Sequence, residues 1–197
     1  MIAESILIEY GAEEVEIDKN DYLFREGQVA RKYFQVKEGK VKMNNYTEEG
    51  KEFIQSIFEK GASFGEPPLF GEFKYPANAI ALENSTVMAL SQNAFFELLK
   101  ENPLVHLEFT KTLANRLYYK ALMAVEISSE HAQHRILTLL DYFKGLSDFH
   151  DRKSFEVNLT RQQIGDLCGL RVETVIRTLK ELEQEGEIDI RKRKVFR

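Results

Sequence analysis

Residues 160–186 limit the possible folds of this chain more than any other segment does. Thr160 and Gln163 have the T-x-x-Q spacing of a capping box, which satisfies free backbone N–H groups at the start of a helix. Gly169 predicts a sharp turn after this helix, and Gly186 predicts the end of a second one. Two short helices joined by a turn that contains glycine are typical of a helix-turn-helix motif, with an ordinary helical hairpin as the alternative.

The apolar residues of this segment recur at helical spacing. Gly165 is small where the two helices must cross closely, and Cys168, the only cysteine of the chain, occupies an inward position typical of a small buried residue. A single cysteine also excludes a disulfide framework and an iron–sulfur site built by this chain alone. We expect the inward face to consist of five residues: Ile164, Leu167, Val175, Leu179 and Leu182.

The outward side of the second helix carries groups that can pair with base edges. Glu173 and Arg177 lie four residues apart near its N-terminal end, where arginine can pair with guanine and glutamate with cytosine. An ion pair between these two side chains is the alternative. We assign base readout to Arg171, Glu173, Thr174 and Arg177. We assign phosphate contacts to Thr160, Arg161, Gln162, Lys180, Arg191 and Lys192.

Charge is distributed unevenly along the chain, whose net charge is −5. Residues 1–130 hold 14 Lys and Arg against 21 Asp and Glu, which gives −7, whereas residues 131–197 hold 13 against 11, which gives +2. The total net charge speaks against a nucleic-acid binder, but the basic C-terminal part permits one.

The last residues, EIDIRKRKVFR, predict two strands around Arg191-Lys192. They would form a small wing whose cations would lie near phosphates; a solvated basic tail is the alternative.

Residues 14–91 have the pattern of short strands separated by glycine. With 43% hydrophobic residues the chain can fill a core, and glycines spaced about 11–12 residues apart favour an antiparallel barrel or jelly roll. The expected strands are VEIDKNDYLF, YFQVKE, KVKMNNYT, EFIQSIF, ANAIAL and TVMALS.

Residues 104–129 contain no glycine or proline and predict one long helix. Two apolar stripes on it favour a helix that serves both its own domain and a partner, whereas a single core-facing helix needs only one. Steps of three and four residues give a seam of small residues suited to close helix pairing: Leu107, Thr110, Ala114, Leu117, Ala121, Ala124 and Ser128. The second stripe consists of Phe109, Leu113, Met123 and Ile127, with Leu122 and Val125.

The whole chain resembles the cyclic-AMP receptor/fumarate-nitrate regulator (CRP/FNR) family of bacterial transcription factors. The matching pieces are FREG (24–27), VKEGKVKM (36–43), EEGKEF (48–53), GASFGEPPLF (61–70) and LTRQQIGDLCGLRVETVIRTLKELEQEG (159–186), in which V-E-T-x-x-R matches the fumarate-nitrate branch. The resemblance implies an α+β chain. Its parts would be a β-roll effector domain at 1–102, a dimerisation helix at 103–129 and a winged helix-turn-helix domain at 130–197.

The sequence departs from the family at the positions that hold a cyclic nucleotide. Gly65 and Glu66 are kept, but the positions that bind the cyclic phosphate hold Tyr75 and Pro76, which supply no fixed cation. Lys120 stands where the long helix would reach the adenine. We therefore expect no response to cyclic AMP and no cofactor. Three alternatives follow for this possible effector pocket: a different ligand, no ligand with activity set by expression, or a partner protein that acts on the roll.

Three hypotheses follow for the function. The leading one is a homodimeric regulator that binds double-stranded DNA at an inverted repeat, with RNA polymerase as a further partner. The alternative is a ligand-binding module whose helical domain contacts a protein. An enzyme with a cupin-like metal barrel is excluded because residues 1–105 contain no two histidines.

The start of the chain is acidic, and no apolar run approaches the roughly 18 residues of a membrane span. We expect a cytoplasmic protein without a membrane partner.

Overall fold

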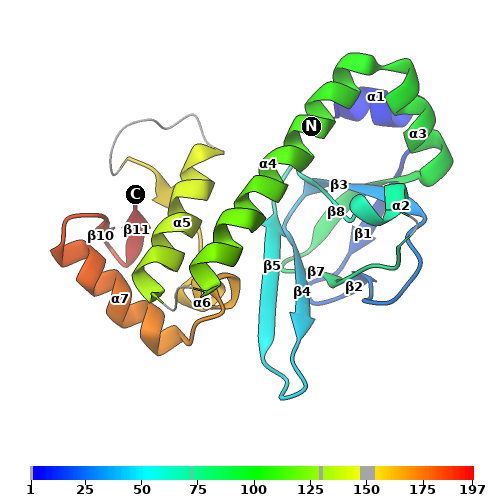
Figure 1. Ribbon diagram of the computed structural model, residues 1–197. Coiled ribbons are helices and arrows are strands. Elements are labelled where there is room, and N and C mark those ends of the chain that lie inside the picture. The colour runs from blue at the N-terminus through cyan, green and yellow to red at the C-terminus, as the bar shows by residue number, and fades with distance from the viewer. Residues whose placement is uncertain (1, 72, 129–130, 147–153) are drawn as a thin grey trace. The chain divides into compact units, whose positions relative to one another are not determined.

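The chain forms two units, Met1–Leu113 and Ala114–Arg197, and both contribute to one long helix. A computed structural model (Figure 1) describes residues 2–71, 73–128, 131–146 and 154–197. The expected domain boundary at 129/130 lies outside these residues. Within them, no helix is long and apolar enough to cross a membrane.

Strands dominate the first unit, as its glycine spacing predicts. Its helices are α1 (Glu4–Glu9), α2 (Pro67–Gly71), α3 (Gln92–Glu101) and the first part of α4 (Pro103–Ser128). Its strands are β1 (Glu13–Ile17), β2 (Tyr22–Phe24), β3 (Lys32–Glu38), β4 (Val41–Tyr46), β5 (Glu52–Phe58), β6 (Ser63–Phe64), β7 (Asn78–Ala81) and β8 (Ser85–Ser91).

Two antiparallel four-stranded sheets make up the roll, in the orders β1-β8-β3-β6 and β2-β7-β4-β5. Figure 1 shows the β4–β5 hairpin extending beyond the other strands. The core lies between the sheets, because both contribute apolar residues to one buried cluster, such as Val36 from β3 and Val41 from β4. The α+β fold class expected from the sequence is confirmed.

The expected strand at residues 15–24 is wrong. The chain leaves β1 after Ile17 and enters β2 at Tyr22, and these strands belong to different sheets. Asn20 lies between them with a φ of 72°, a left-handed conformation that asparagine tolerates better than most residues. A turn of four residues therefore replaces the continuous strand.

The second unit contains the rest of α4 and a small three-helix domain with a sheet. Its other elements are α5 (Ala132–Gly145), β9 (Glu156–Val157), α6 (Arg161–Cys168), α7 (Val172–Gln184), β10 (Asp189–Arg191) and β11 (Lys194–Phe196). The helices α5, α6 and α7 pack on one another (Figure 1), and the sheet has the order β10-β11-β9. The pairing of β11 with β9 adds a strand that the sequence patterns did not predict.

Candidate functional site

The first helix of the predicted motif, α6, begins with the capping box that the sequence indicates. Thr160 Oγ1 accepts a hydrogen bond from the Gln163 backbone N–H at 3.1 Å, and Gln163 Oε1 accepts one from the Thr160 N–H at 2.8 Å. The helix ends at Gly169, whose φ of 67° would strain a residue with a side chain. These contacts confirm the predicted bounds of the helix.

Gly165 lets the two helices of the motif approach each other. A Cβ atom at this position would lie 2.9 Å from the carbonyl oxygen of Leu170 and 3.6 Å from Cγ2 of Val175. The Leu170 N–H donates a hydrogen bond of 2.8 Å to the Gly165 carbonyl oxygen, so the turn folds directly back on α6. The close crossing predicted from this glycine is therefore present.

The inward faces of α6 and α7 form one core, as predicted. All five residues of the expected inward face are nearly inaccessible to solvent: Ile164, Leu167, Val175, Leu179 and Leu182. Cys168 is also fully buried; its Sγ lies 3.6 Å from the carbonyl oxygen of Arg135, and burial raises the pKa of its thiol to about 12. This packing fixes which side of α7 faces solvent.

Three of the four candidate base-reading residues are exposed on α7 or at its start, namely Arg171, Glu173 and Arg177, while Thr174 is half-buried. Arg177 Nε lies 3.9 Å from Glu181 Oε1, so its ion pair points along the helix to Glu181 rather than to Glu173. Arg171 provides no side-chain cap for α7, as its residue type predicts. The Arg177 side chain is 73% exposed and could exchange this weak ion pair for a base contact.

The candidate phosphate contacts on α6 and α7 have different surroundings. Lys180 and Gln162 are exposed, although Gln162 Nε2 donates a hydrogen bond to Asp166 Oδ1 at 2.8 Å. Arg161 is half-buried, and its Nη2 donates a hydrogen bond of 3.1 Å to the carbonyl oxygen of Arg193. Burial lowers the pKa of the Arg161 guanidinium. Arg161 thus already has a partner within the protein.

The wing is the hairpin of β10 and β11, and its turn lies one residue later than the sequence indicated. Arg191 pairs with Lys194 in the strand register, so Lys192 and Arg193 form the turn. Their φ values of 47° and 67° are those of a two-residue type I′ turn, which suits the twist of a hairpin. The prediction that placed the turn at Arg191-Lys192 is corrected accordingly.

The two cations that flank the turn of the wing have partners within the protein. Arg191 Nη2 lies 2.5 Å from Asp189 Oδ2, and its guanidinium lies 4.9 Å from the centre of the Phe196 ring. Lys194 Nζ lies 2.5 Å from Glu156 Oε1. Of the two wing residues assigned to phosphate, Arg191 is held by these contacts, and Lys192 lies in the exposed turn.

All seven seam residues of α4 are exposed. Leu107 and Leu117 are 52% and 70% exposed, although buried leucine is the norm in a folded chain. The second stripe divides: Phe109 and Met123 are buried, whereas three of its members are exposed, Leu122, Val125 and Ile127. An exposed apolar face therefore runs along this helix, as the seam predicts.

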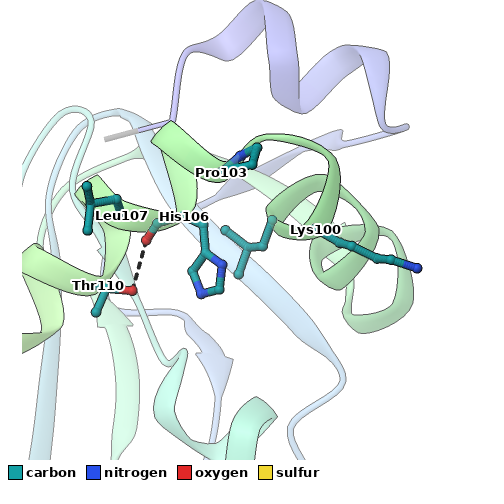
Figure 2. Close-up of a pocket in the computed structure, with 6 residues that line it drawn as sticks. Lys100, Pro103, His106, Leu107 and Thr110 are labelled. Atoms are coloured by element: carbon teal, nitrogen blue, oxygen red, sulfur yellow. Dashed lines mark hydrogen bonds between the residues drawn. The ribbon is translucent and has the colours of Figure 1, made fainter.

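A hollow of about 300 Å³ lies at the start of this face, between the end of α3 and the first turns of α4. Leu107 and Thr110 of the seam line it together with Lys100 and His106. Figure 2 shows the His106 imidazole between Thr110 and Lys100, with the ammonium of Lys100 pointing away. Thr110 Oγ1 donates a hydrogen bond to the His106 carbonyl oxygen at 2.9 Å, so its polar group is satisfied within the helix.

Aromatic rings fill the corner of the roll where the resemblance places the cyclic phosphate. Tyr75 is buried and stacks on Phe24, with ring centroids 3.6 Å apart and planes 9° apart. Gly65 has a φ of 74°, and a Cβ there would lie 3.1 Å from the Phe24 ring and 3.3 Å from the Tyr75 ring. Gly65 thus leaves the space that the stacked rings of Phe24 and Tyr75 occupy.

The residues that the sequence assigned to a possible effector pocket have the following surroundings. Glu66 is buried, and burial followed by the charge of Glu66 raises the pKa of the Tyr75 hydroxyl to about 12. The carbonyl oxygen of Pro76 accepts a hydrogen bond of 2.7 Å from Asn45 Nδ2. Lys120 is exposed on α4, and desolvation by neighbouring atoms, followed by repulsion from Arg116, lowers its pKa.

Two residues at these sites, Phe24 and Arg193, were not assigned a role from the sequence. Phe24 closes the phosphate corner, and Arg193 lies at the wing tip. No local sequence signal marks either residue, because the strand register of the wing decides the position of Arg193 and the pairing of β2 with β7, which connects distant segments, decides the surroundings of Tyr75. Among the described residues, no group of three His, Cys, Asp or Glu side chains could hold a metal ion.

Comparison with known proteins yields two family models. The cyclic nucleotide-binding domain matches residues 14–102, and the Crp-like helix-turn-helix domain matches residues 134–197.

Two curated relatives and one solved structure extend over most of the chain. Electron transport regulator A of Shewanella oneidensis is 26% identical over 89% of this chain and 70% of that protein. The cAMP-activated global transcriptional regulator CRP of Haemophilus influenzae is 28% identical over 84% of this chain and 75% of that protein. The structure of FixK2 from Bradyrhizobium japonicum has a TM-score of 0.75 at 20% identity, over 94% of this chain and 91% of that one. This last likeness concerns the fold.

Proposed function

This chain belongs to the CRP/FNR family of transcription regulators, and we propose from that premise that it acts as a homodimer on an inverted repeat in duplex DNA. It is a DNA-binding regulator and not an enzyme. In this proposal residues 1–102 form the effector domain, 103–129 the dimerisation helix and 130–197 the DNA-binding domain.

The exposed side of α7 carries the proposal for base readout. Arg177 and Glu173 lie on that side near the start of the helix, and the buried core behind them fixes its orientation. A recognition helix contacts base edges with its N-terminal residues in the major groove. Arg177 would pair with a guanine and Glu173 with a cytosine, in a half-site related to TTGA or GTGA.

The exposed apolar face of α4 supports the homodimer. Small residues such as Ala114, Ala121 and Ala124 allow two helices to approach closely, and the flanking Leu117 would gain burial in a helix pair. In a dimer with two-fold symmetry the same face of each chain meets its counterpart, which matches an inverted repeat in the DNA.

Selection of bound sites from random duplex DNA tests this function directly. We expect an inverted repeat whose half-sites are centred about 10–10.5 base pairs apart. Binding should also fall steeply with salt, because basic side chains displace counterions from phosphates. Recovery of a single asymmetric half-site, or of no preferred sequence, would refute the proposed mode of binding.

The stacked rings that fill this corner of the roll support the proposal that cyclic AMP is not the effector. Tyr75 and Pro76, at the positions that the resemblance assigns to the phosphate, supply no cation to an anion whose burial requires one, and the carboxyl group of Glu66 is buried. Titration calorimetry with cyclic AMP and cyclic GMP should show no binding. A dissociation constant in the low micromolar range, with a matching gain in DNA affinity, would contradict this part of the proposal.

RNA polymerase is a further partner in this proposal, since a regulator of transcription acts where polymerase binds. We place the protein in the cytoplasm for the same reason, because bacterial DNA and RNA polymerase are found there.

A further inference from the structure

Ile176 is a large apolar side chain that lies exposed on α7. It is 44% exposed, while Val175, Leu179 and Leu182 of the same helix are buried. A single exposed apolar residue on a protein surface needs no explanation by itself. Isoleucine is nevertheless disfavoured at an exposed helical position, because its β-branched side chain loses rotamer freedom there and gains little burial in return. The place of Ile176 on the helix therefore matters.

The neighbours of Ile176 on the helix surface are the residues proposed to read bases. At about 3.6 residues per turn, Ile176 and Arg177 lie about 60° and about 40° on either side of Glu173 around the helix axis. Glu173 and Arg177 are both exposed, and the buried face of α7 fixes the direction in which this side of the helix points. Any docking that brings these two side chains to base edges therefore brings Ile176 into the same groove.

The chemistry of isoleucine limits what it can recognise in the major groove. Its side chain has no donor or acceptor, so against an amino group, a carbonyl oxygen or a ring nitrogen it would displace water without replacing the lost hydrogen bonds. The C5 methyl group of thymine is the apolar group that a base edge presents in this groove. Contact between two apolar groups removes both from water, which favours binding. Isoleucine at this position thus suits a thymine.

We propose that Ile176 is a specificity-determining residue that contacts the C5 methyl group of a thymine, in a base pair next to those that Glu173 and Arg177 read. The inference rests on the proposed function and names the side chain that reads one further base of its half-site. It extends base readout beyond the polar residues that the sequence assigned. Because the contact is apolar, it adds selectivity without neutralising a phosphate.

Deoxyuridine scanning of the duplex recovered by selection tests this contact. Uracil pairs as thymine does and lacks only the methyl group. One thymine at a time is replaced in both half-sites, and the affinity of the wild-type protein is measured for each duplex. At the contacted thymine the affinity should fall by about fourfold per half-site, which corresponds to the burial of one methyl group, and by about fifteenfold for the dimer.

The variant Ile176→Ala completes a double-mutant cycle with the deoxyuridine duplex. It should bind the thymine duplex and the uracil duplex equally, because it lacks the side chain that contacts the methyl group. Its slope of log affinity against log salt should equal that of the wild-type protein, because no phosphate contact is lost. Alanine favours a helix, so the variant should fold, as circular dichroism will show.

Ile8→Ala is the matched control, since Ile8 is also an exposed isoleucine of a helix, in α1 of the other unit. This variant should bind the thymine duplex as the wild-type protein does and should show the same loss on the uracil duplex. Selection from random DNA with Ile176→Ala should return the same guanine and cytosine, with a relaxed preference at the thymine alone.

Equal affinity of the wild-type protein for the thymine duplex and for every uracil duplex would overturn the proposal. A loss on the uracil duplex that persists in full in Ile176→Ala would overturn it as well, because the methyl group would then contact another residue. Failure of the proposed function is distinguishable from both outcomes, since the wild-type protein itself would then show no sequence-selective binding.

Discussion

Replacing Gly165 by alanine should loosen the crossing of α6 and α7. The added methyl group favours the helix by up to about 1 kcal/mol. It would also lie 2.9 Å from the backbone carbonyl oxygen of Leu170, closer than side-chain carbons approach such atoms, and backbone cannot move aside as a flexible side chain can. Overpacking of this kind costs about 1–3 kcal/mol. The strain should therefore equal or exceed the gain in helix propensity.

Gly145→Ala is the control for this variant. Gly145 is the last residue of α5, it does not require a positive φ, and no atom of the residues that the structure describes lies within 4 Å of a Cβ built on it. Its replacement keeps the gain in helix propensity without the close contact. The free energies of unfolding of the two variants should thus differ by about 1–3 kcal/mol, with Gly165→Ala the less stable.

Urea unfolding followed by circular dichroism measures this difference, and amide hydrogen exchange locates it in α6 and α7. Because a shifted α7 presents its outer side differently, Gly165→Ala should also weaken binding to the selected DNA site, whereas Gly145→Ala should not. Equal stability of the two variants would refute the argument that Gly165 is retained for close packing.

Three further predictions concern the dimer, the DNA contacts and the roll. Combining Ala121→Glu with Ala124→Glu puts two carboxylates per chain on the seam, so the protein should sediment as a monomer and lose DNA affinity. Arg177→Ala should reduce the binding free energy at the selected site by about 1–3 kcal/mol and relax the selectivity at one base pair, whereas Lys192→Ala should lower the affinity for all duplexes alike. Affinities for variant sites measure this difference. The raised pKa of Tyr75 predicts that the free energy of unfolding falls as the pH rises from about 10 to about 12, because the unfolded chain ionises more readily.

Each of these predictions has a control. Asn115→Glu adds a carboxylate to an exposed position of α4 outside the seam and should leave the dimer intact. The two DNA variants control each other, and identical behaviour would refute the separation of base readout from phosphate contact. Tyr75→Phe removes the hydroxyl, so urea unfolding at several pH values should show a shallower alkaline decline; the same decline in both proteins would contradict the stated cause.

Local rules explain why the helix-turn-helix could be predicted closely from the sequence. Its start depends on Thr160 and Gln163, three residues apart, and its turn depends on the left-handed conformation of Gly169. Such contacts form within one or two helical turns and leave a clear spacing in the sequence. The exposed seam of α4 follows in the same way from helical periodicity.

Contacts between distant segments explain what could not be predicted. Residues 15–24 have the composition of one strand, and only the pairing of β1 with β8 and of β2 with β7 shows that they divide between two sheets. The sequence indicated that Tyr75 offers no cation, but not that its ring would stack on Phe24, about fifty residues earlier. The wing turn moved by one residue because a run of four cations gives no turn signal, and the strand register decides the position.

The burial of Cys168 makes this protein suited to thiol cross-linking. Cys168 is the only cysteine in the chain, and a buried thiol with a pKa near 12 is largely unreactive at neutral pH. A cysteine introduced at Ala121 would therefore be the one reactive sulfur of each chain. In the proposed dimer that sulfur would face its own counterpart across the two-fold axis, so mild oxidation would join two chains covalently, whereas chains associated through another surface would stay separate.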